Sequence, residues 1–221
     1  MSSREDILGR VRASLHRNAG NAATAREVMA AALANRNPGP QPAVSSEPRA
    51  LLERFRVKSE QASSTVEIVA TEVEVPAAIA KYLAAMNLPT TAVAWASLGA
   101  LDWAGAGLTV ETRGARDADL VGITGCFCAV AETGTLMMTS SPDTPAAVSL
   151  LPETHIAVVR AARIVAYMED AWNLARDELG SLPRAVNFIS GPSRTGDIEQ
   201  TIVLGAHGPY RVHIIVVGGP V

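Results

Sequence analysis

Two stretches decide the fold of this chain: HIAVVR at residues 155–160 and HIIVVGG at residues 213–219. Each is a nearly continuous aliphatic run, without the apolar and polar alternation of a strand that has one face in water. Such runs are typical of the central strands of a parallel sheet that is covered on both faces. We therefore predict that both segments lie in the middle of a buried sheet.

The segments around these runs alternate between strand and helix patterns. Strands are predicted at 65–70, 90–95, 107–111, 119–123, 126–131, 135–139, 155–160, 185–190 and 211–217. Helices are predicted at 49–62, 76–86, 143–149, 167–179 and 197–203, and Gly180 follows the fourth of them in the position typical of a helix end. This alternation predicts an α/β layer fold with a largely parallel sheet.

The N-terminal part differs from the rest, and residues 1–36 are predicted to form a helical appendage. Residues 4–17 have the apolar spacing of an amphipathic helix, and residues 22–35 are rich in alanine with a thin apolar face. The segment NPGPQPAVSSEP at 37–48 contains four prolines and is predicted to be a linker. The α/β domain is then expected to span residues 49–221.

The composition argues against several classes of function. Aromatic residues make up only 4% of the chain and the net charge is -3, so we expect no nucleic-acid partner. No run approaches the roughly 18 apolar residues that span a bilayer. The N-terminus also lacks the uninterrupted apolar segment of a signal peptide, and we therefore expect a cytoplasmic protein. No Gly-x-Gly-x-x-Gly opens a helix after the first strand, so the dinucleotide fingerprint is missing.

The two cysteines of the chain, Cys126 and Cys128, raise the question of a metal site. In a strand they would share one face, and His155 or His207 would complete a set of zinc ligands. Zinc-binding cysteines are, however, usually separated by about two to four residues, and a buried free cysteine usually packs as a small hydrophobe. We predict no metal site, and a single copy lacks the four thiolates of an iron-sulfur cluster.

Three small-residue loops are the candidates for a ligand site: AETGT at 131–135, GPSRTGD at 191–197 and GAHGP at 205–209. Ligands of open α/β sheets bind beyond the carboxyl ends of the strands, and we expect the three loops to meet at that edge. The ligand-binding candidates are the glycines and polar residues of these loops: Thr133, Gly134, Thr135, Gly191, Ser193, Arg194, Thr195, Asp197, Gly205 and Gly208.

The GPSRTGD loop supports two interpretations. Hydroxyl groups and free backbone N–H groups at the start of the predicted helix would form an anion site, and Arg194 would add a bidentate contact to a phosphate or carboxylate. Ser193, Thr195 or Asp197 would equally serve as an N-cap of that helix. A cap and an anion site are compatible with each other.

Glu132 and His207 are the catalytic candidates. Glu132 is the only charged residue between Asp119 and Asp143, so it is a base, a ligand-binding group or a nucleophile, or else a strand-end carboxylate held by backbone N–H groups. His207, between glycines, is a general acid or base, an anion partner, or a histidine in a tight turn.

Four segments together resemble the LUD domain of lactate utilization proteins. They are GITGCFCAVAETGTLMM (122–138), SLLPETHIAVVRAARIV (149–165), FISGPSRTGDIEQTIVLGAHGP (188–209) and RVHIIVVGG (211–219). The resemblance covers about residues 49–219, and the single-domain members match best in size and order. It implies a Rossmann-like three-layer α/β fold similar to the sugar-phosphate isomerase and CoA-transferase superfamily.

The same resemblance implies a subunit of a cytoplasmic system that oxidises L-lactate to pyruvate. Its partners would be iron-sulfur proteins, and this chain would be the subunit without clusters or other cofactors, rather than a complete enzyme. It would bind a small carboxylate or a phosphorylated ligand, and a homo-oligomer is compatible with this role.

Two alternatives stay open. One is a stand-alone acyl- or CoA-transferase-like enzyme that uses Glu132, because Glu132-Thr133-Gly134 is similar in outline to the Glu-Asn-Gly motif of class I CoA-transferases. The other is a non-catalytic docking module whose N-terminal helices bind a partner.

Overall fold

The computed structural model describes residues 3–18, 20–35, 38–195, 203–205 and 207–218. The chain divides into two compact units, Met1–Gln41 and Pro42–Val221, at a boundary inside the proline-rich segment. The first unit contains helices α1 (Ser3–Ser14) and α2 (Ala22–Asn35), and none of their described residues is buried. No helix within the described ranges is both long and apolar enough to cross a bilayer.

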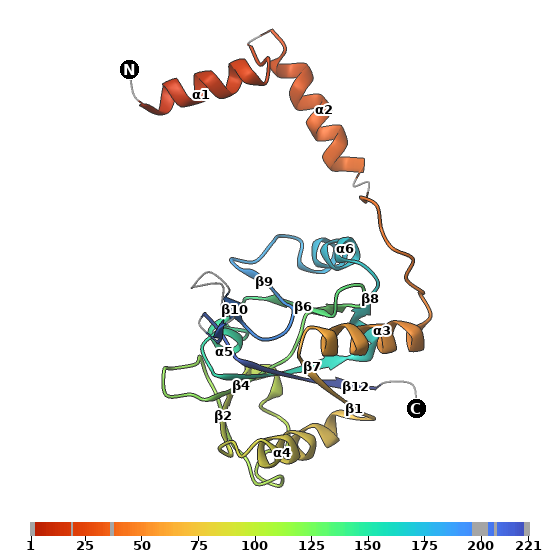
Figure 1. Ribbon diagram of the computed structural model, residues 1–221, viewed down its shortest axis with the longest axis vertical. Coiled ribbons are helices and arrows are strands. Elements are labelled where there is room, and N and C mark those ends of the chain that lie inside the picture. Colours follow the sequence, from red (N-terminus) through yellow and green to blue (C-terminus); the bar gives the residue numbers. More distant parts are fainter. Residues whose placement is uncertain (1–2, 19, 36–37, 196–202, 206, 219–221) are drawn as a thin grey trace. The chain divides into compact units, whose positions relative to one another are not determined.

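The centre of the second unit is a six-stranded sheet with the order β1-β12-β7-β4-β2-β3, in which all neighbours are parallel (Figure 1). Its strands are β1 (Thr65–Val69), β2 (Thr91–Ala94), β3 (Thr109–Thr112), β4 (Val121–Thr124), β7 (Thr154–Arg160) and β12 (Arg211–Val217). The two aliphatic runs form β7 and β12, which are adjacent and buried along most of their length. The prediction of two buried inner strands is therefore confirmed.

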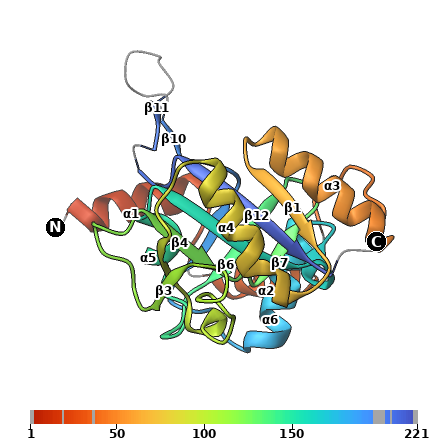
Figure 2. The ribbon, with the colours of Figure 1, turned by 90° about the horizontal axis from the view of Figure 1, so that it is seen from below.

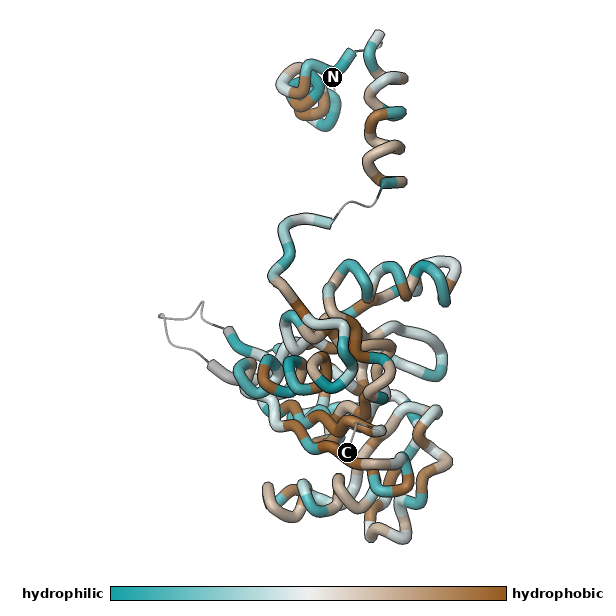
Figure 3. The backbone as a smooth tube through the Cα atoms, turned by 90° about the vertical axis from the view of Figure 1, so that its right-hand side faces the viewer, coloured by the Kyte–Doolittle hydropathy of each residue, from teal (hydrophilic) through white to brown (hydrophobic). Residues whose placement is uncertain are grey.

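Helices and a smaller sheet cover the two faces of the central sheet. The helices are α3 (Pro48–Gln61), α4 (Val75–Ala85), α5 (Ala147–Leu150) and α6 (Met168–Leu179), with short 3₁₀ helices η1 (Glu72–Glu74), η2 (Ala96–Leu98) and η3 (Ala161–Arg163). On one face, Ile79 and Leu83 of α4 pack into a cluster with Ile215. On the other, Phe55 of α3 shares a cluster with Ile214. Apolar residues accordingly concentrate in the inner strands (Figure 3).

Local sequence signals set the ends of two of these helices. The Glu47 carboxylate accepts hydrogen bonds from the N–H groups of Arg49 (3.1 Å) and Ala50 (2.7 Å), and Pro48 occupies the first helical position of α3. Gly180 ends α6 with a positive φ of 66°, as the sequence predicted.

The second sheet has the order β8-β5-β6-β9. Its strands are β5 (Cys128–Val130), β6 (Thr135–Thr139), β8 (Ile164–Val165) and β9 (Val186–Ile189). Side chains of β5 alternate between the two faces: Ala129 packs toward the central sheet, whereas Cys128 packs against Ala171 and Ala175 of α6. Because β5 and β6 are buried on both faces, their apolar pattern resembles that of the central strands, and the sequence did not reveal that they form a separate sheet.

Of the predicted helix at 197–203, the structure describes only Val203, which lies in a strand and not in a helix. Strands β10 (Arg194–Thr195) and β11 (Val203–Leu204) pair in antiparallel fashion and project as a narrow ribbon (Figure 2). The start of the predicted helix, including Asp197, lies outside the described residues.

Candidate functional site

The AETGT and GPSRTGD loops both pack against the last turns of α3. Gly134 has a φ of 69°, and a Cβ added there would overlap the backbone of Lys58 and Ser59. Gly191 has a φ of 83°, and its Cβ would overlap the carbonyl oxygen of Ala62. Both positions therefore require glycine for close backbone packing, independently of any ligand.

Hydroxyl groups join these two loops. The Thr135 Oγ1 atom lies 2.7 Å from Thr133 Oγ1 and 2.6 Å from Ser190 Oγ. The Arg194 guanidinium donates a hydrogen bond to the hydroxyl of Ser63, directly after α3. The candidate hydroxyls of AETGT thus lie beside the strand that leads into Gly191, and they are bonded to one another.

The GPSRTGD and GAHGP loops also meet, as predicted. The Ser193 N–H donates to the Pro209 carbonyl (2.8 Å), and the Gly205 N–H donates to the Ser193 carbonyl (2.9 Å). A Cβ on Gly208 would lie 3.4 Å from the Ser193 Cβ.

Their position on the sheet differs from the prediction. Tyr210 and Arg211, at the start of β12, donate their N–H groups to the carbonyl of Glu153, which precedes β7. These loops therefore lie at the amino edge of the central sheet, and the expected carboxyl edge is wrong. GAHGP precedes a parallel strand, and a loop in that position lies at the amino end of the strand.

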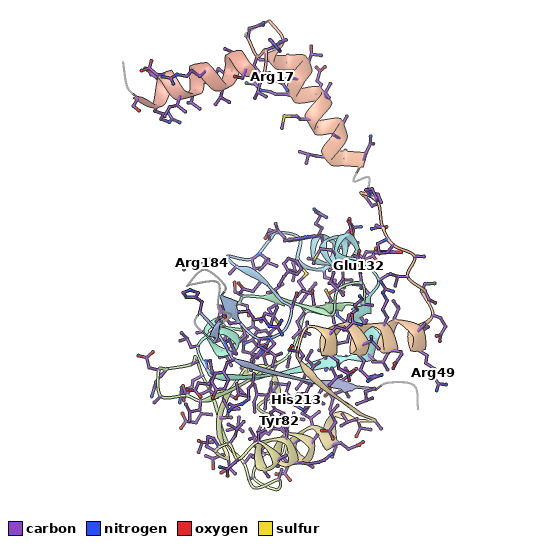
Figure 4. The ribbon with its side chains drawn as sticks, viewed as in Figure 1. Arg17, Arg49, Tyr82, Glu132, Arg184 and His213 are labelled. Atoms are coloured by element: carbon purple, nitrogen blue, oxygen red, sulfur yellow. The ribbon has the colours of Figure 1, made fainter. Side chains whose placement is uncertain are left out.

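The Glu132 carboxylate lies apart from the candidates Arg194 and His207, which the structure describes. It is half-buried, and its N–H donates to the Ala166 carbonyl (3.0 Å), which places it beside β8 and the start of α6 (Figure 4). Among the described residues, its carboxylate makes no hydrogen bond to Arg194 or His207. His207 is exposed. The catalytic roles of Glu132 and His207 stay predictions.

The two thiols have the surroundings of packing groups. The Cys126 Sγ donates to the Cys128 carbonyl (2.8 Å), and the Cys128 Sγ lies 3.7 Å from the Met137 Sδ. Burial raises the pKa of both thiols, that of Cys128 to about 12. His155 lies within β7 and bonds to Thr124 instead. Within the described ranges, no three His, Cys, Asp or Glu residues gather closely enough to hold a metal ion.

A pocket that sequence reasoning missed opens beyond the carboxyl ends of β2, β4 and β7. It has a volume of about 470 Å³ and is lined by Trp95 after β2, Gly125 and Cys126 after β4, and Arg160 at the end of β7. Strand β2 is followed by β3 on one side, whereas β4 is followed by β7 on the other. The direction in which successive strands are added across the sheet thus reverses between β2 and β4, and such a switch point is where open α/β sheets bind ligands. We call this cavity the switch-point pocket.

The walls of the switch-point pocket divide into an apolar and a polar part. The apolar part consists of Val75, Leu98, Leu101 and Val158 with the rings of Trp95 and Phe127, and the uncharged polar part includes Ser97, Cys126, Thr139 and Thr144. The Trp95 Nε1–H donates to the Pro145 carbonyl (3.1 Å), which fixes the indole ring in the wall. Gly125, Cys126 and Phe127 follow one another after β4, whereas the other lining residues come from several separate elements.

Two ion pairs line the same pocket. Arg160 donates to Glu72 (2.7 Å), and Arg163 donates to both carboxylate oxygens of Glu178 (2.6 and 2.9 Å). Arg163 also donates its Nε–H to the Phe127 carbonyl (2.8 Å), with the guanidinium carbon 4.8 Å from the centre of the Phe127 ring. Arg163 is therefore held in a fixed position, whereas Arg160 is largely exposed.

The family profile of the LUD domain matches residues 52–217. Lactate utilization protein C of Bacillus subtilis (strain 168) is 41% identical over 100 residues, which cover 44% of this chain and 42% of that protein. Lactate utilization protein C of Shouchella clausii is 43% identical over 99 residues, covering 44% and 43%. The alignments thus span less than half the length of these relatives.

One solved structure is similar along most of the chain. It is the crystal structure of a DUF162 family protein from Deinococcus radiodurans, with a TM-score of 0.59 and 26% identity. The similarity covers 79% of this chain and 100% of that one.

Proposed function

This chain belongs to the LUD domain family, and from that premise we propose that it is a component of a system that oxidises L-lactate to pyruvate. The observation that carries the proposal is its identity of 41% and 43% to two proteins named lactate utilization protein C. In this proposal the protein acts in the cytoplasm with iron-sulfur partners that hold the clusters. Its own part is to bind a small carboxylate or a phosphorylated ligand.

Growth on lactate tests the proposed role. A strain of the native host without the gene should fail to grow on L-lactate as sole carbon source and should grow normally on pyruvate, the product. The pyruvate culture is the control for a general growth defect. Normal growth of the deletion strain on L-lactate would contradict the proposal.

Co-purification tests the partners separately. The tagged full-length chain, isolated from lactate-grown cells, should retain proteins with the absorbance of iron-sulfur clusters. The same preparation from cells grown without lactate is the control. Isolation of the chain without any such protein, from cells that do use lactate, would leave the lactate role standing and remove the partner assignment.

A docking role for the N-terminal unit is supported by its exposed apolar side chains. On α1, directly after it and on α2 they are Ile7, Val11, Leu15, Val28, Met29 and Leu33, each about half exposed or more. Isolated helices of this length are marginally stable in water, so a partner would stabilise them. Removal of residues 1–41 should abolish retention of the iron-sulfur partners, and retention by the shortened chain would exclude this docking role.

A further inference from the structure

We infer that the switch-point pocket binds a planar conjugated molecule carrying a single phosphate or carboxylate group. This deepens the ligand-binding part of the proposed function and rests on that part, but it does not depend on the role in lactate oxidation. The ligand site inferred here therefore differs from the three glycine loops that the sequence suggested. Those loops lie at α3 and at the amino edge of the sheet, where close backbone packing accounts for Gly134 and Gly191.

The size of the pocket sets the size of its ligand. Its volume of about 470 Å³ falls in the range of roughly 300–1,000 Å³ that holds drug-sized molecules and cofactors. A three-carbon acid such as lactate would leave most of this space to water, and its burial would desolvate little apolar surface. The pocket therefore suits a ligand with at least a fused ring system.

The apolar wall favours a flat ring. The Trp95 side chain is almost fully buried and is fixed by its bond to Pro145, and Phe127 is held by the cation above its ring. Both aromatic side chains line the cavity together with the aliphatic Leu98 and Val158. Rigid aromatic and aliphatic walls stabilise a planar conjugated ligand through stacking and exclusion of water.

The arginines provide donors for an anion. A guanidinium has five N–H groups, and within the described residues Arg163 uses one on each of its three nitrogens. Each of its terminal nitrogens thus keeps one further N–H, and Arg160 keeps more, because only its Nε–H is bonded to a residue that the structure describes. An anion at this place gains charge-assisted hydrogen bonds while both ion pairs persist.

The balance of charge limits the ligand to one anionic group. Glu72 and Glu178 line the pocket together with the two arginines, so the ionised side chains cancel. A polyphosphate would face two carboxylates without an excess of cations. A single phosphate monoester or carboxylate needs only the spare donors of Arg163 and Arg160, and the uncharged residues Thr139 and Thr144 line the same cavity.

Matched probes test the inference with the full-length chain. FMN and riboflavin share a ring but differ in the phosphate, and 2-naphthoate and 2-naphthol share a ring but differ in the carboxylate. At least one anionic probe should bind about tenfold or more tightly than its neutral partner, as one added charge-assisted hydrogen bond predicts. L-lactate and inorganic phosphate should bind more weakly than that probe, because they lack the ring. The phosphate and carboxylate arms distinguish the two sources of the anion.

Two variants at neighbouring positions test whether the probes bind in the switch-point pocket. Ser97 and Ala96 are adjacent and exposed on η2, but only Ser97 lines the cavity. Ser97→Trp should weaken binding of the anionic probe by about tenfold or more by filling the pocket, whereas Ala96→Trp should leave it unchanged. Circular dichroism and thermal unfolding of both variants establish that they fold.

Several results would overturn the inference. They are no binding of any ring probe, equal binding of the charged and neutral partners, or equal binding by the Ser97→Trp and Ala96→Trp variants. Tighter binding of the planar cation N-methylquinolinium than of 2-naphthoate would also overturn the assigned charge. Binding is measured on the purified chain and the lactate role by growth, so failure of one is distinguishable from failure of the other.

Discussion

Two histidines are buried in the central sheet without a charged hydrogen-bond partner. The His155 Nε2 lies 2.8 Å from the Thr124 hydroxyl, and the His213 Nδ1 lies 2.8 Å from the Thr65 hydroxyl. The ring of Tyr82 stacks on His213 with 3.9 Å between centroids (Figure 4). The second ring nitrogen of each histidine has no hydrogen-bond partner among the described residues. Burial lowers the pKa of both to about 4, so both are neutral at pH 7.

These histidines predict a loss of stability in mild acid. The unfolded chain takes up protons near pH 6.5, whereas the folded chain takes them up only near pH 4. Stability is therefore full above about pH 6.5 and falls as the pH drops toward 4, by up to about 3 kcal/mol for each histidine. Urea unfolding at several pH values measures this fall. The variants His155→Gln and His213→Gln should each show a shallower fall, and an unchanged slope in both would contradict the account.

The close packing of Gly134 on α3 predicts that a side chain added at this position lowers the free energy of unfolding. Gly134 and Gly107 both have a positive φ, 69° and 76°, but a Cβ at Gly107 meets nothing within 4 Å. Gly107→Ala should therefore cost only about 1 kcal/mol of unfolding free energy, the strain of the backbone conformation. Gly134→Ala adds an overlap with α3 and should cost about 3 kcal/mol or more. Equal costs in urea unfolding would show that the turn does not pack on α3 as described.

At the scale of elements, the β5–β6 hairpin connects two regions of the domain. Phe127 precedes β5 and Thr139 ends β6, and both line the switch-point pocket. The turn at the other end of the hairpin contains Gly134, which packs on α3. A strand rises by about 3.3 Å for each residue, so the three residues of β5 hold the pocket and the turn too far apart for direct contact between their side chains. The pocket and the AETGT loop are therefore separate sites.

Arg163 joins three elements beside this hairpin. It follows β7 in η3, donates to the Phe127 carbonyl before β5, and pairs with Glu178 of α6. Arg163→Met removes the donor from a part-buried carbonyl and should cost about 1–2 kcal/mol of unfolding free energy. Arg176→Met, on the same helix as Glu178, removes only a 3.3 Å bond to Asn173 and should cost less than about 0.5 kcal/mol. Urea unfolding of the two variants should separate them, and equal values would mean that Arg163 does not join these elements.

The hydrophobic pattern and the helix-ending glycine predicted most elements from the sequence. Strands β7 and β12 are marked by aliphatic runs, and the end of α6 is marked by Gly180. These signals did not predict which strands share a sheet, since β5 and β6 are buried on both faces like the central strands. They also did not predict the pairing of β10 with β11, because strands of two residues carry no periodic signal of their own. The switch-point pocket was missed because Trp95, Cys126, Thr139 and Arg163 are far apart in the sequence and meet only through the fold.

At the scale of the whole molecule, this member of the LUD domain family places a pocket at the switch point of a parallel sheet, and it is similar to proteins named lactate utilization protein C. The glycine loops that carry the family resemblance lie elsewhere and pack the chain against α3 and the amino edge. We therefore assign ligand binding to the pocket and close backbone packing to Gly134 and Gly191. We propose that ligand binding in the pocket is required for lactate use.

Complementation of the deletion strain tests that claim most directly. Genes encoding the Ser97→Trp and Ala96→Trp variants should be expressed at equal levels in the strain and compared for growth on L-lactate, with pyruvate as control. The account predicts that Ala96→Trp restores growth on L-lactate and that Ser97→Trp does not, while both grow on pyruvate. Equal growth of the two variants on L-lactate would contradict it.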